Sequence, residues 1–352
     1  MILLADLVDR YRSDLERIHG QELLPSHHHA LNCIRSCRNQ RSAVMLLGCG
    51  DCHHRITLPH SCGHRSCPHC QHHESQQWLE RQRAKRLPVD YLLVTFTVPA
   101  ELRRMFWQHQ RTAYDLLLKT AWATLSSFGR RDPSLMGQIG AHAVLHTHSR
   151  RLDYHPHVHL IVPAGAVDEQ KNQWRRKKGN YLFPARNLAR VFRAKWFEAI
   201  RLAGLHAQES VPPQWVVDCK AVGRGDKALL YLGRYLYRGV INEPDITADQ
   251  GGTVTFRYTE NSGAIRTRTH SGGEFLWLLL QHVLPKGFRR VRDYGFLHGN
   301  GKKLMQLLRL LLKVVVPEHP QPSQRAPALC PHCGHAMTII DTRLRLDGPM
   351  LC

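Results

Sequence analysis

Two histidines, His157 and His159, flank one valine in the segment Y-H-P-H-V-H-L-I-V-P-A-G, residues 154–165. The β-branched apolar run that follows them and stops at Pro163 is typical of a buried strand. Successive side chains of a strand point to opposite faces, so both imidazoles should leave one face while Val158 points into a core. Two neutral imidazoles held side by side can chelate a divalent metal. The alternative is a pair of surface histidines, because the chain contains 25 histidines.

The second segment with candidate chemistry, residues 228–241, reads A-L-L-Y-L-G-R-Y-L-Y-R-G-V-I. At about 100° per residue, as in an α-helix, its apolar side chains gather on one side. The opposite side carries two phenols four residues apart and two guanidinium groups, from Tyr231, Tyr235, Arg234 and Arg238. A tyrosine can attack phosphorus and form a covalent ester, and arginines can hold the phosphate in a bidentate way. The alternative is an ordinary amphipathic helix that is partly buried.

The two segments together predict one reaction, the cleavage of a phosphodiester. A divalent metal polarises a phosphodiester oxygen, and a tyrosine attacks in line and keeps the 5′ end as a phosphotyrosine. The third metal ligand stays open between His146, on a neighbouring predicted strand, and Asn242, which shares the tyrosine face only if the helix continues past Gly239. With nitrogen and oxygen ligands the ion is Mg²⁺ or Mn²⁺: histidines favour Mn²⁺ in affinity, and availability favours Mg²⁺.

The cysteines indicate structural zinc. Cys49-x2-Cys52 and Cys67-x2-Cys70 are two C-x-x-C pairs with 14 residues between them, a spacing that suits a tetrahedral site of four thiolates. Cys62 lies in the loop between the pairs and can substitute as a ligand. Basic residues around this segment favour a role in DNA contact. A zinc module used only for protein contacts is the alternative.

Two further cysteine pairs are open to more than one interpretation. Cys33 and Cys37 lie four residues apart on a predicted helix; we interpret them as core thiols that are also candidate ligands. Cys330 and Cys333 form a C-x-x-C pair near the C-terminus, with Cys352 as a third thiol and His335 as a candidate fourth ligand. We interpret this last pair as half of a zinc ribbon that is cut short.

The charge balance favours a polyanionic partner. Of the 352 residues, 49 are Lys or Arg and 28 are Asp or Glu, a difference of 21. A membrane surface is the rival partner, but no apolar run approaches about 18 residues and no signal peptide is recognised at Met1. C-x-x-C pairs favour metal over disulfides in a reducing compartment. We therefore expect a cytoplasmic protein that works on DNA at the bacterial nucleoid.

Two basic segments are candidates for contacts with the DNA backbone. One follows the cysteine segment, and the other lies in the middle of the chain near Trp174, whose ring can stack on a base. Such runs most often mark solvated faces. The residues for which we predict DNA contacts are Arg81, Arg83, Arg86, Arg175, Arg176, Lys177 and Lys178.

The order of the predicted elements favours an α+β fold with a compact antiparallel sheet. Strands are predicted near 91–98, 140–148, 154–163 and 214–221, and helices near 3–18, 99–128, 187–203 and 228–241. We expect four parts: an N-terminal helix and zinc-binding module at 1–88, a catalytic endonuclease core at 89–245, a helical accessory region at 246–316, and a linker with a partial zinc-ribbon-like tail at 317–352.

Several segments resemble, in order, those of the His-hydrophobic-His endonuclease superfamily, which includes rolling-circle replication initiators, relaxases and some transposases. The closer likeness is to the two-tyrosine rolling-circle insertion-sequence transposases, and it extends from about residue 30 to residue 335. The matching segments are C-G-D-C at 49–52, S-C-G-H-R-S-C-P-H-C-Q at 61–71, V-T-F-T-V-P at 94–99, Y-L-G-R-Y-L-Y-R at 231–238 and H-V-L-P-K-G-F-R-R-V-R-D-Y-G at 282–295.

This resemblance implies a zinc-binding module before an antiparallel endonuclease core, with single-stranded DNA or hairpin element ends as the partner. We therefore predict a DNA transposase that nicks and rejoins single-stranded DNA through a 5′-phosphotyrosine and moves an insertion sequence by a rolling-circle mechanism. One alternative is a zinc-containing DNA-binding regulator without catalysis. Another is the same chemistry in a replication initiator or a relaxase, which the zinc segment and residues 282–295 resemble less.

Overall fold

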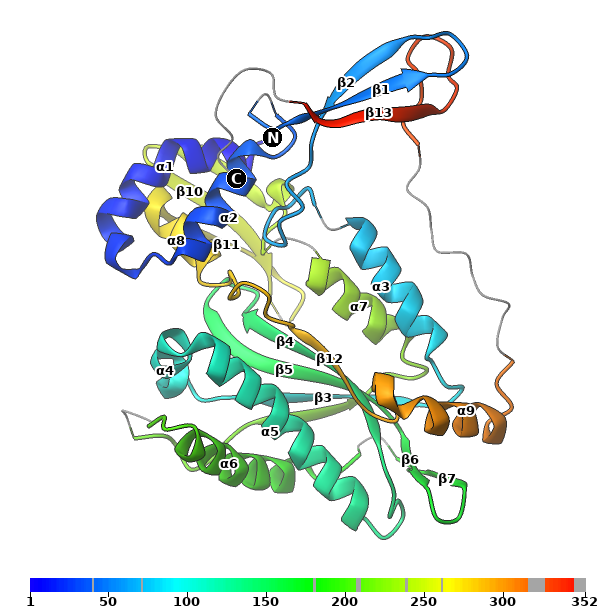
Figure 1. Ribbon diagram of the computed structural model, residues 1–352. Helices are drawn as coiled ribbons and strands as arrows, with labels where there is room; N and C mark the ends of the chain where they lie inside the picture. The colour runs from blue at the N-terminus through cyan, green and yellow to red at the C-terminus, as the bar shows by residue number, and fades with distance from the viewer. Residues whose placement is uncertain are drawn as a thin grey trace.

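The computed structural model describes residues 1–39, 41–70, 72–179, 182–206, 210–237, 240–260, 262–315 and 327–344, with the backbone alone at 234–237 and 343–344. Within these ranges the chain is α+β, as the sequence predicted, and its sheets are antiparallel. Figure 1 shows a central sheet with helices on both faces, a group of N-terminal helices beside it and a small ribbon at one end. None of the helices in these ranges is long and apolar enough to span a lipid bilayer.

The central sheet has five strands in the order β12–β4–β5–β3–β8. They are β3 Tyr91–Thr97, β4 Gly140–His148, β5 Tyr154–Pro163, β8 Val217–Ala221 and β12 Val291–Gly295. β4 and β5 are consecutive in the sequence and pair through the turn at 149–153, which places them next to each other inside the sheet. β12, which lies in the region expected to be accessory, supplies an edge strand through its pairing with β4.

One face of the sheet is covered by helices that bury the main hydrophobic core (Figure 1). These are α4 Arg103–Gln108, α5 Gln110–Arg131 and α6 Ala185–Leu202, with the short 3-10 turn η2 Ala100–Leu102 before them. Phe106 of α4 stacks on Trp196 of α6, with ring centroids 5.2 Å apart. The single helix expected near 99–128 is interrupted, because His109 adopts φ −125° and ψ 40°, outside the helical range.

The other face of the sheet carries α3 His72–Ala84, α7 Asp226–Tyr237 and α9 Lys302–Leu311. Leu229 and Leu232 of α7 are buried in a cluster with side chains of β4 and β5, which confirms the predicted apolar side of this helix. α3 lies against α7 (Figure 1). Trp78 of α3 packs on Gly233, where an added Cβ would lie 3.3 Å from the indole ring. The glycine therefore permits a close approach of the two helices.

The N-terminal helices form a second core with part of the C-terminal half. α1 Leu4–His19 and α2 Pro25–Ser36 pack with α8 Gly272–Leu280 and with the sheet β9–β10–β11. The strands of this sheet are β9 Ile246–Gln250, β10 Thr253–Thr259 and β11 Ile265–Ser271. α1 contributes one buried stripe at helical spacing, made of Leu4, Leu7, Val8, Tyr11 and Leu15.

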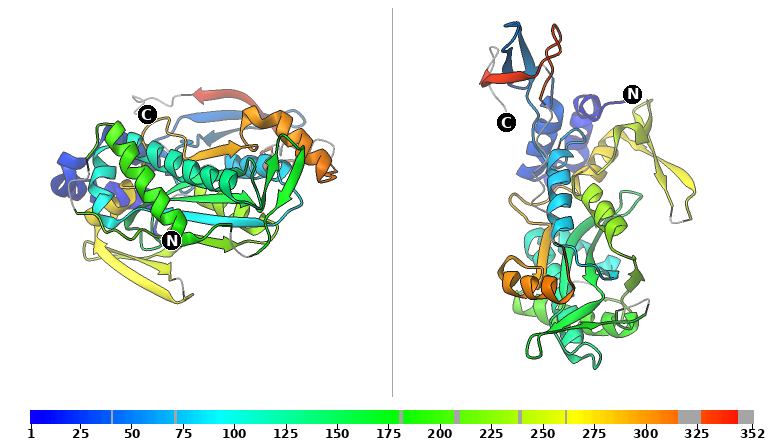
Figure 2. Two further views of the ribbon diagram at one scale, coloured as in Figure 1. Left: turned by 90° about the horizontal axis from the view of Figure 1, so that it is seen from below. Right: turned by 90° about the vertical axis from the view of Figure 1, so that its right-hand side faces the viewer.

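A third sheet joins segments from the two ends of the described chain. β1 Val44–Cys49 and β2 Arg55–Pro59 form a hairpin, and β13 Met337–Leu344 pairs with β1, so the order is β13–β1–β2. Figure 2 shows this ribbon projecting from the rest of the molecule. A separate two-stranded ribbon, β6 Gly165–Asp168 and β7 Gln173–Arg176, follows β5.

His27 links the stability of the N-terminal helices to pH. Its side chain is fully buried in α2, and it stacks on Trp107 with ring centroids 5.6 Å apart. Its Nδ1 accepts a hydrogen bond from the backbone N–H of Leu24 at 3.1 Å. Burial, helped by the charge of His28, lowers the pKa of His27 to about 4.

We predict that His27→Gln flattens the pH dependence of folding. The unfolded chain takes up a proton at this histidine near pH 6.5, and the folded chain does so only near pH 4, so the free energy of unfolding falls as the pH drops through this window. The variant should reduce the slope of unfolding free energy against pH by up to about 1.4 kcal/mol per pH unit. Urea unfolding between these two pH values measures the effect, with the exposed His206→Gln as the control. An unchanged slope in His27→Gln would contradict the prediction.

Candidate functional site

β5 presents its histidines on one face of the central sheet. His157 and His159 alternate with Val158, which is fully buried in the main core on the opposite face. The two imidazoles are half-buried and lie on the face that carries α7. This is the placement that the alternation of the sequence predicted.

The register between β4 and β5 adds a third imidazole. His146 of β4 lies directly opposite His157. The ring centroid of His146 lies 5.1 Å from that of His157 and 4.3 Å from that of His159, and the latter two are 4.9 Å apart. One nitrogen of each ring lies within 4.8 Å of the others. Of the two candidates for the third ligand, the structure therefore brings His146 to the pair.

Asn242, the other candidate, does not line the cavity over the histidines but an adjoining one, together with Tyr231 and Arg150. It is exposed, and its Nδ2 donates a hydrogen bond to Oδ2 of Asp245 at 3.1 Å. It caps the 3-10 turn η3 Glu243–Asp245 with an extended backbone, φ −93° and ψ 140°. The condition under which Asn242 would share the tyrosine face is therefore not met, because α7 ends at Tyr237 and Asn242 has an extended backbone.

Neighbouring oxygen atoms orient two of the three rings. Nδ1 of His157 lies 2.7 Å from the carbonyl oxygen of His155, and a carbonyl can only accept, so Nδ1 carries the proton. Nε2 of His157 is then the nitrogen that can bind a metal. Nδ1 of His159 lies 2.9 Å from Oγ1 of Thr95, which is directly opposite it on β3. Hydrogen bonds of this kind fix the ring orientation of metal-binding histidines.

Burial keeps the three imidazoles neutral. It lowers the pKa of His157 to about 3 and the pKa of His159 to about 4. Burial, together with the charges of the other two histidines, holds the pKa of His146 well below its ordinary value. Neutral imidazole is the form that binds a metal. Three such donors on one rigid sheet fit a first-row divalent ion such as Mn²⁺.

Tyr231 lies beside this histidine cluster. It projects from α7, and its ring centroid is 6.2 Å from that of His146 and 6.3 Å from that of His159. Half of the side chain, 50%, is exposed, so a substrate can reach the phenol. Burial of the remainder raises the pKa of Tyr231, and the nearby Arg150 lowers it. A phenol in this position can attack a phosphate held at the histidines.

The remaining side chains of the predicted tyrosine face lie outside the described residues. The backbone of α7 is helical through Arg234 and Tyr235, whose side chains are not described, and Arg238 falls wholly outside. A helical backbone puts residues four apart on the same face. The roles of these three residues stay predictions.

The histidines and Tyr231 open into one cavity of about 790 Å³. Its walls come from the sheet, from the turn between β4 and β5, and from the β10–β11 hairpin. The cavity is also lined by three cations that the sequence analysis did not identify. They are Arg150, Arg151 and Lys220. Arg150 also donates to the carbonyl oxygen of Glu260 at 2.8 Å, which anchors the end of the hairpin. In the sequence, the pair Arg150-Arg151 shortly after a predicted strand was the signal that could have indicated cations at this cavity.

The first cysteine cluster contains Cys37, Cys62, Cys67 and Cys70. The Sγ atom of Cys70 lies 3.5 Å from that of Cys37 and 3.7 Å from that of Cys62. These distances suit four sulfurs around one zinc ion and are far longer than a disulfide bond of about 2.05 Å. Hydrogen bonds from the other three thiols lower the pKa of Cys70, which favours a thiolate there. Cys37, which we interpreted as a core thiol, belongs to this cluster.

The second cluster contains Cys49, Cys52, Cys330 and Cys333. The Sγ atoms of Cys49 and Cys333 lie 3.4 Å apart, and those of Cys52 and Cys330 lie 3.5 Å apart. Burial raises the pKa of the Cys330 thiol, but hydrogen bonds from the backbone of Cys333 and His332 lower it, to about 7. The C-terminal pair is therefore not half of a truncated site, because the β1–β2 turn supplies the other half.

The single four-thiolate site expected from Cys49, Cys52, Cys67 and Cys70 is thus corrected to two clusters. Cys49 and Cys52 lie at the turn of the β1–β2 hairpin, and β2 then carries the chain away from that turn. A strand rises about 3.3 Å per residue, so the five residues of β2 separate the two pairs by roughly 15 Å. Pairs at opposite ends of a hairpin cannot share an ion, and each finds its partners elsewhere.

The predicted DNA-contact residues differ in how exposed their charge is. Arg81 and Arg83 are exposed on α3, Arg86 pairs with Asp226, and Lys178 is exposed. The other three are paired with carboxylates: Arg175 with Asp168, Arg176 with Asp90, and Lys177 with Asp132. This second run lies at β7, toward the end of β5 that is remote from the histidines (Figure 1). Neighbouring acids thus offset much of its charge.

Two family models match the chain. Residues 140–304 match the family described as "Putative transposase", and residues 4–98 match the "Transposase zinc-binding domain". The first range includes the three histidines and Tyr231, and the second includes the first cysteine cluster and the β1–β2 turn. The zinc-binding match and the cysteine clusters together support structural zinc.

Two similar proteins cover most of the chain. It is 31% identical, over 388 aligned positions, to "Putative transposase y4qJ" of Sinorhizobium fredii (strain NBRC 101917 / NGR234), with 99% of this chain and 97% of that protein covered. It is also 31% identical, over 291 positions, to "Transposase for insertion sequence element IS801" of Pseudomonas savastanoi pv. phaseolicola, with 74% of this chain and 68% of that protein covered. No solved structure matches the chain closely enough to be counted as similar.

We predict that Cys37→Ser removes the metal from the first cluster alone. A serine hydroxyl is a poor substitute for a thiolate on zinc, and the binding free energy of such a site is part of the folding free energy. Elemental analysis of the full chain should show a loss of about one zinc equivalent, with a lower melting temperature. Cys219→Ser is the control: this partly buried free cysteine lies on β8, outside both clusters. Equal zinc loss in both variants would count against the assignment.

Proposed function

Because this chain belongs to the family of insertion-sequence transposases of the IS91 and IS801 type, we propose that it cuts DNA with a tyrosine nucleophile beside a divalent metal held by three histidines. The protein is a transposase, and its partner is DNA. The observation that carries the proposal is the position of the Tyr231 ring, about 6 Å from two of the three clustered imidazoles and open to solvent.

The proposed cleavage uses Tyr231 as the nucleophile. When bound by His146, His157 and His159, Mg²⁺ or Mn²⁺ would polarise a phosphodiester oxygen and orient the phosphate. Tyr231 Oη attacks phosphorus in line, the bond to the 3′ oxygen breaks, and the 5′ phosphate stays on the tyrosine. The proton that the phenol loses is balanced by the proton that the 3′ oxygen gains. Arg150, at the rim of the cavity, is placed to neutralise the phosphate.

A second tyrosine turns a nick into strand transfer. Tyr235 lies one helical turn after Tyr231, and the backbone of α7 is helical at both residues. We propose that one phenol holds the first 5′ end while the other makes the second cut, and that Arg234 and Arg238 hold the phosphates. Rolling-circle movement of single-stranded DNA or hairpin ends follows from this alternation, and it is favoured here over a non-catalytic regulator because the comparisons name transposases.

We assign one zinc ion to each cysteine cluster. The first holds the segment before α3 together, and the second ties β13 to the β1–β2 turn. Thiolate sites of this kind require a reducing environment. We therefore place the reaction in the cytoplasm, at the nucleoid, where the DNA substrate is found.

We predict that His157→Ala combined with His159→Ala abolishes cleavage, with a loss of at least about 100-fold in rate, and leaves DNA binding nearly intact. The metal would lose two of its three ligands, whereas cations and aromatic rings elsewhere would still bind the strand. Labelled single-stranded DNA incubated with Mn²⁺ and run on a denaturing gel reports cleavage, and fluorescence anisotropy reports binding. His206→Ala is the control, and full cleavage by the double variant would remove the metal site from the mechanism.

We predict that Tyr231→Phe and Tyr235→Phe each retain some nicking but fail in complete transposition, and that the double variant forms no covalent adduct. Phenylalanine removes only the attacking oxygen and keeps the ring. Adduct formation on a denaturing gel and transposition of a marked element in cells are the two measurements. Tyr237→Phe, about 200° around the helix from Tyr235, is the matched control and should behave as the wild type. If one single variant loses every adduct while the other transposes normally, the enzyme works with one tyrosine.

A further inference from the structure

Glu243 is a buried carboxylate a short distance beyond the tyrosine helix. It is 4% exposed and lies six residues after Tyr237, where α7 ends. Its Oε1 accepts the backbone N–H of Leu4, the first residue of α1, at 2.8 Å. Its Oε2 lies 3.2 Å from Nε2 of His69, which stands between two cysteines of the first cluster. One carboxylate thus connects the chain after α7 to the N-terminal helices and to the cysteine cluster. A buried carboxylate is costly unless it is paired, so these contacts fix its position.

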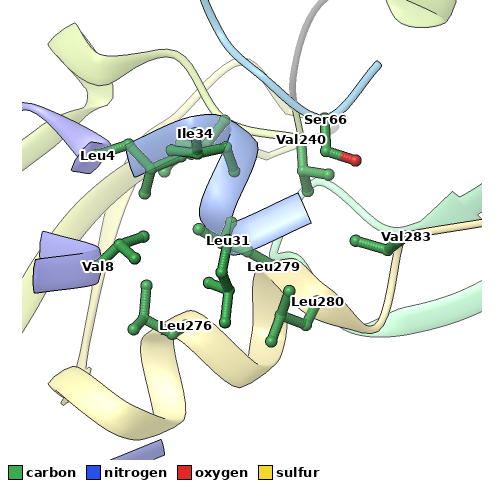
Figure 3. A pocket seen from close by; sticks show the side chains of 11 residues that line it. Leu4, Val8, Leu31, Ile34, Ser66, Val240, Leu276, Leu279, Leu280 and Val283 are labelled. Atoms are coloured by element: carbon green, nitrogen blue, oxygen red, sulfur yellow. The ribbon is translucent and has the colours of Figure 1, made fainter. Parts of the chain in front are cut away.

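Apolar packing holds the same stretch of chain. Val240 and Ile241 lie against Leu4 and Leu31 of the N-terminal helices, and Ser66, next to Cys67, lies at the same junction (Figure 3). The cavity left between these side chains is about 20 Å³. It is too small for more than a water molecule and is lined mainly by aliphatic groups, so it is a packed junction and not a ligand site.

The segment after the first cluster holds α7 itself. α3 begins at His72, two residues after Cys70. Oγ of Ser75 donates to the carbonyl oxygen of Gly233 at 3.1 Å, and Trp78 packs on the same glycine. Gly233 is two residues from Tyr231. The tyrosine helix is therefore held along its side by α3, which begins two residues after Cys70, and the chain beyond the helix is held by Glu243, one oxygen of which faces His69 within the first cysteine cluster.

We propose that the first cysteine cluster positions the nucleophile: by fixing α3 and Glu243, it holds Tyr231 beside the three histidines. Glu243 is a positioning residue, which acts through α7 and not by contact with the reacting atoms. The proposal rests on the proposed function, since it assumes that Tyr231 attacks. In-line attack requires the reacting atoms to be held closely, so a loosened helix costs reaction rate more than DNA affinity.

Variants of Glu243 in the full chain test this proposal. Glu243→Ala removes both contacts, and Glu243→Gln keeps an oxygen for the Leu4 N–H while it loses the carboxylate that faces His69. The rate of covalent adduct formation is measured in a single turnover at saturating single-stranded DNA with Mn²⁺. We expect a loss of about tenfold or more in Glu243→Ala and a smaller loss in Glu243→Gln. DNA affinity should stay within about twofold, and the zinc content should stay that of the wild type.

Asp249→Ala is the matched control. Asp249 anchors the same helix α1 to β9 through Tyr11 and Arg10, about two turns beyond Leu4. Its loss should lower the melting temperature but leave the rate near that of the wild type. A wild-type rate in Glu243→Ala, an equal rate loss in Asp249→Ala, or a loss of zinc from Glu243→Ala would each overturn the positioning role. A wild-type protein that forms no adduct would instead reject the proposed function.

Discussion

The antiparallel register between β4 and β5 is the constraint on which the rest of the site depends. Leu145 lies opposite Val158 on one face, where both are buried in the main core, and His146 lies opposite His157 on the other. Because the side-chain period of a strand is two, a slip of one residue would expose the core pair and turn the imidazoles inward. The hydrophobic core behind the sheet therefore fixes the geometry of the histidine face in front of it.

The chain stabilises its parts by two different means. The central sheet buries a large core between its strands and α4, α5 and α6, whereas the ribbon β13–β1–β2 has a small buried cluster that consists of Leu47, Cys49, Cys330 and Met337. So little apolar surface cannot hold three strands together alone, and thiolate coordination would supply the missing free energy. The cysteines that meet there are 278 and 284 residues apart, so the same coordination would bring both ends of the described chain together.

The positions of the cationic side chains matter more for binding than the net charge of the chain. The net excess of 21 positive charges indicates a polyanionic partner, but it does not say where the partner binds. The basic run at β7 is largely paired with carboxylates, and Lys220 at the cavity is likewise paired with Asp218, whereas Arg150 lines the cavity over the histidines and donates to backbone carbonyl oxygens. A cation whose charge is already paired attracts phosphate less than one that contacts only backbone carbonyls, so Arg150 is better suited than the β7 run to meet a phosphate near Tyr231.

The sequence by itself determined the features that depend on local periodicity. The alternation around Val158 placed His157 and His159 on one face, and the helical spacing of Leu229 and Leu232 placed Tyr231 on the open side of α7. The α+β class followed from the order of the same elements. Tertiary structure alone decided between the candidates for the third ligand, the partners of each cysteine pair and the position of Arg150. These depend on strand register and on contacts between segments that lie far apart in the chain, and a local pattern carries no information about which distant segments meet.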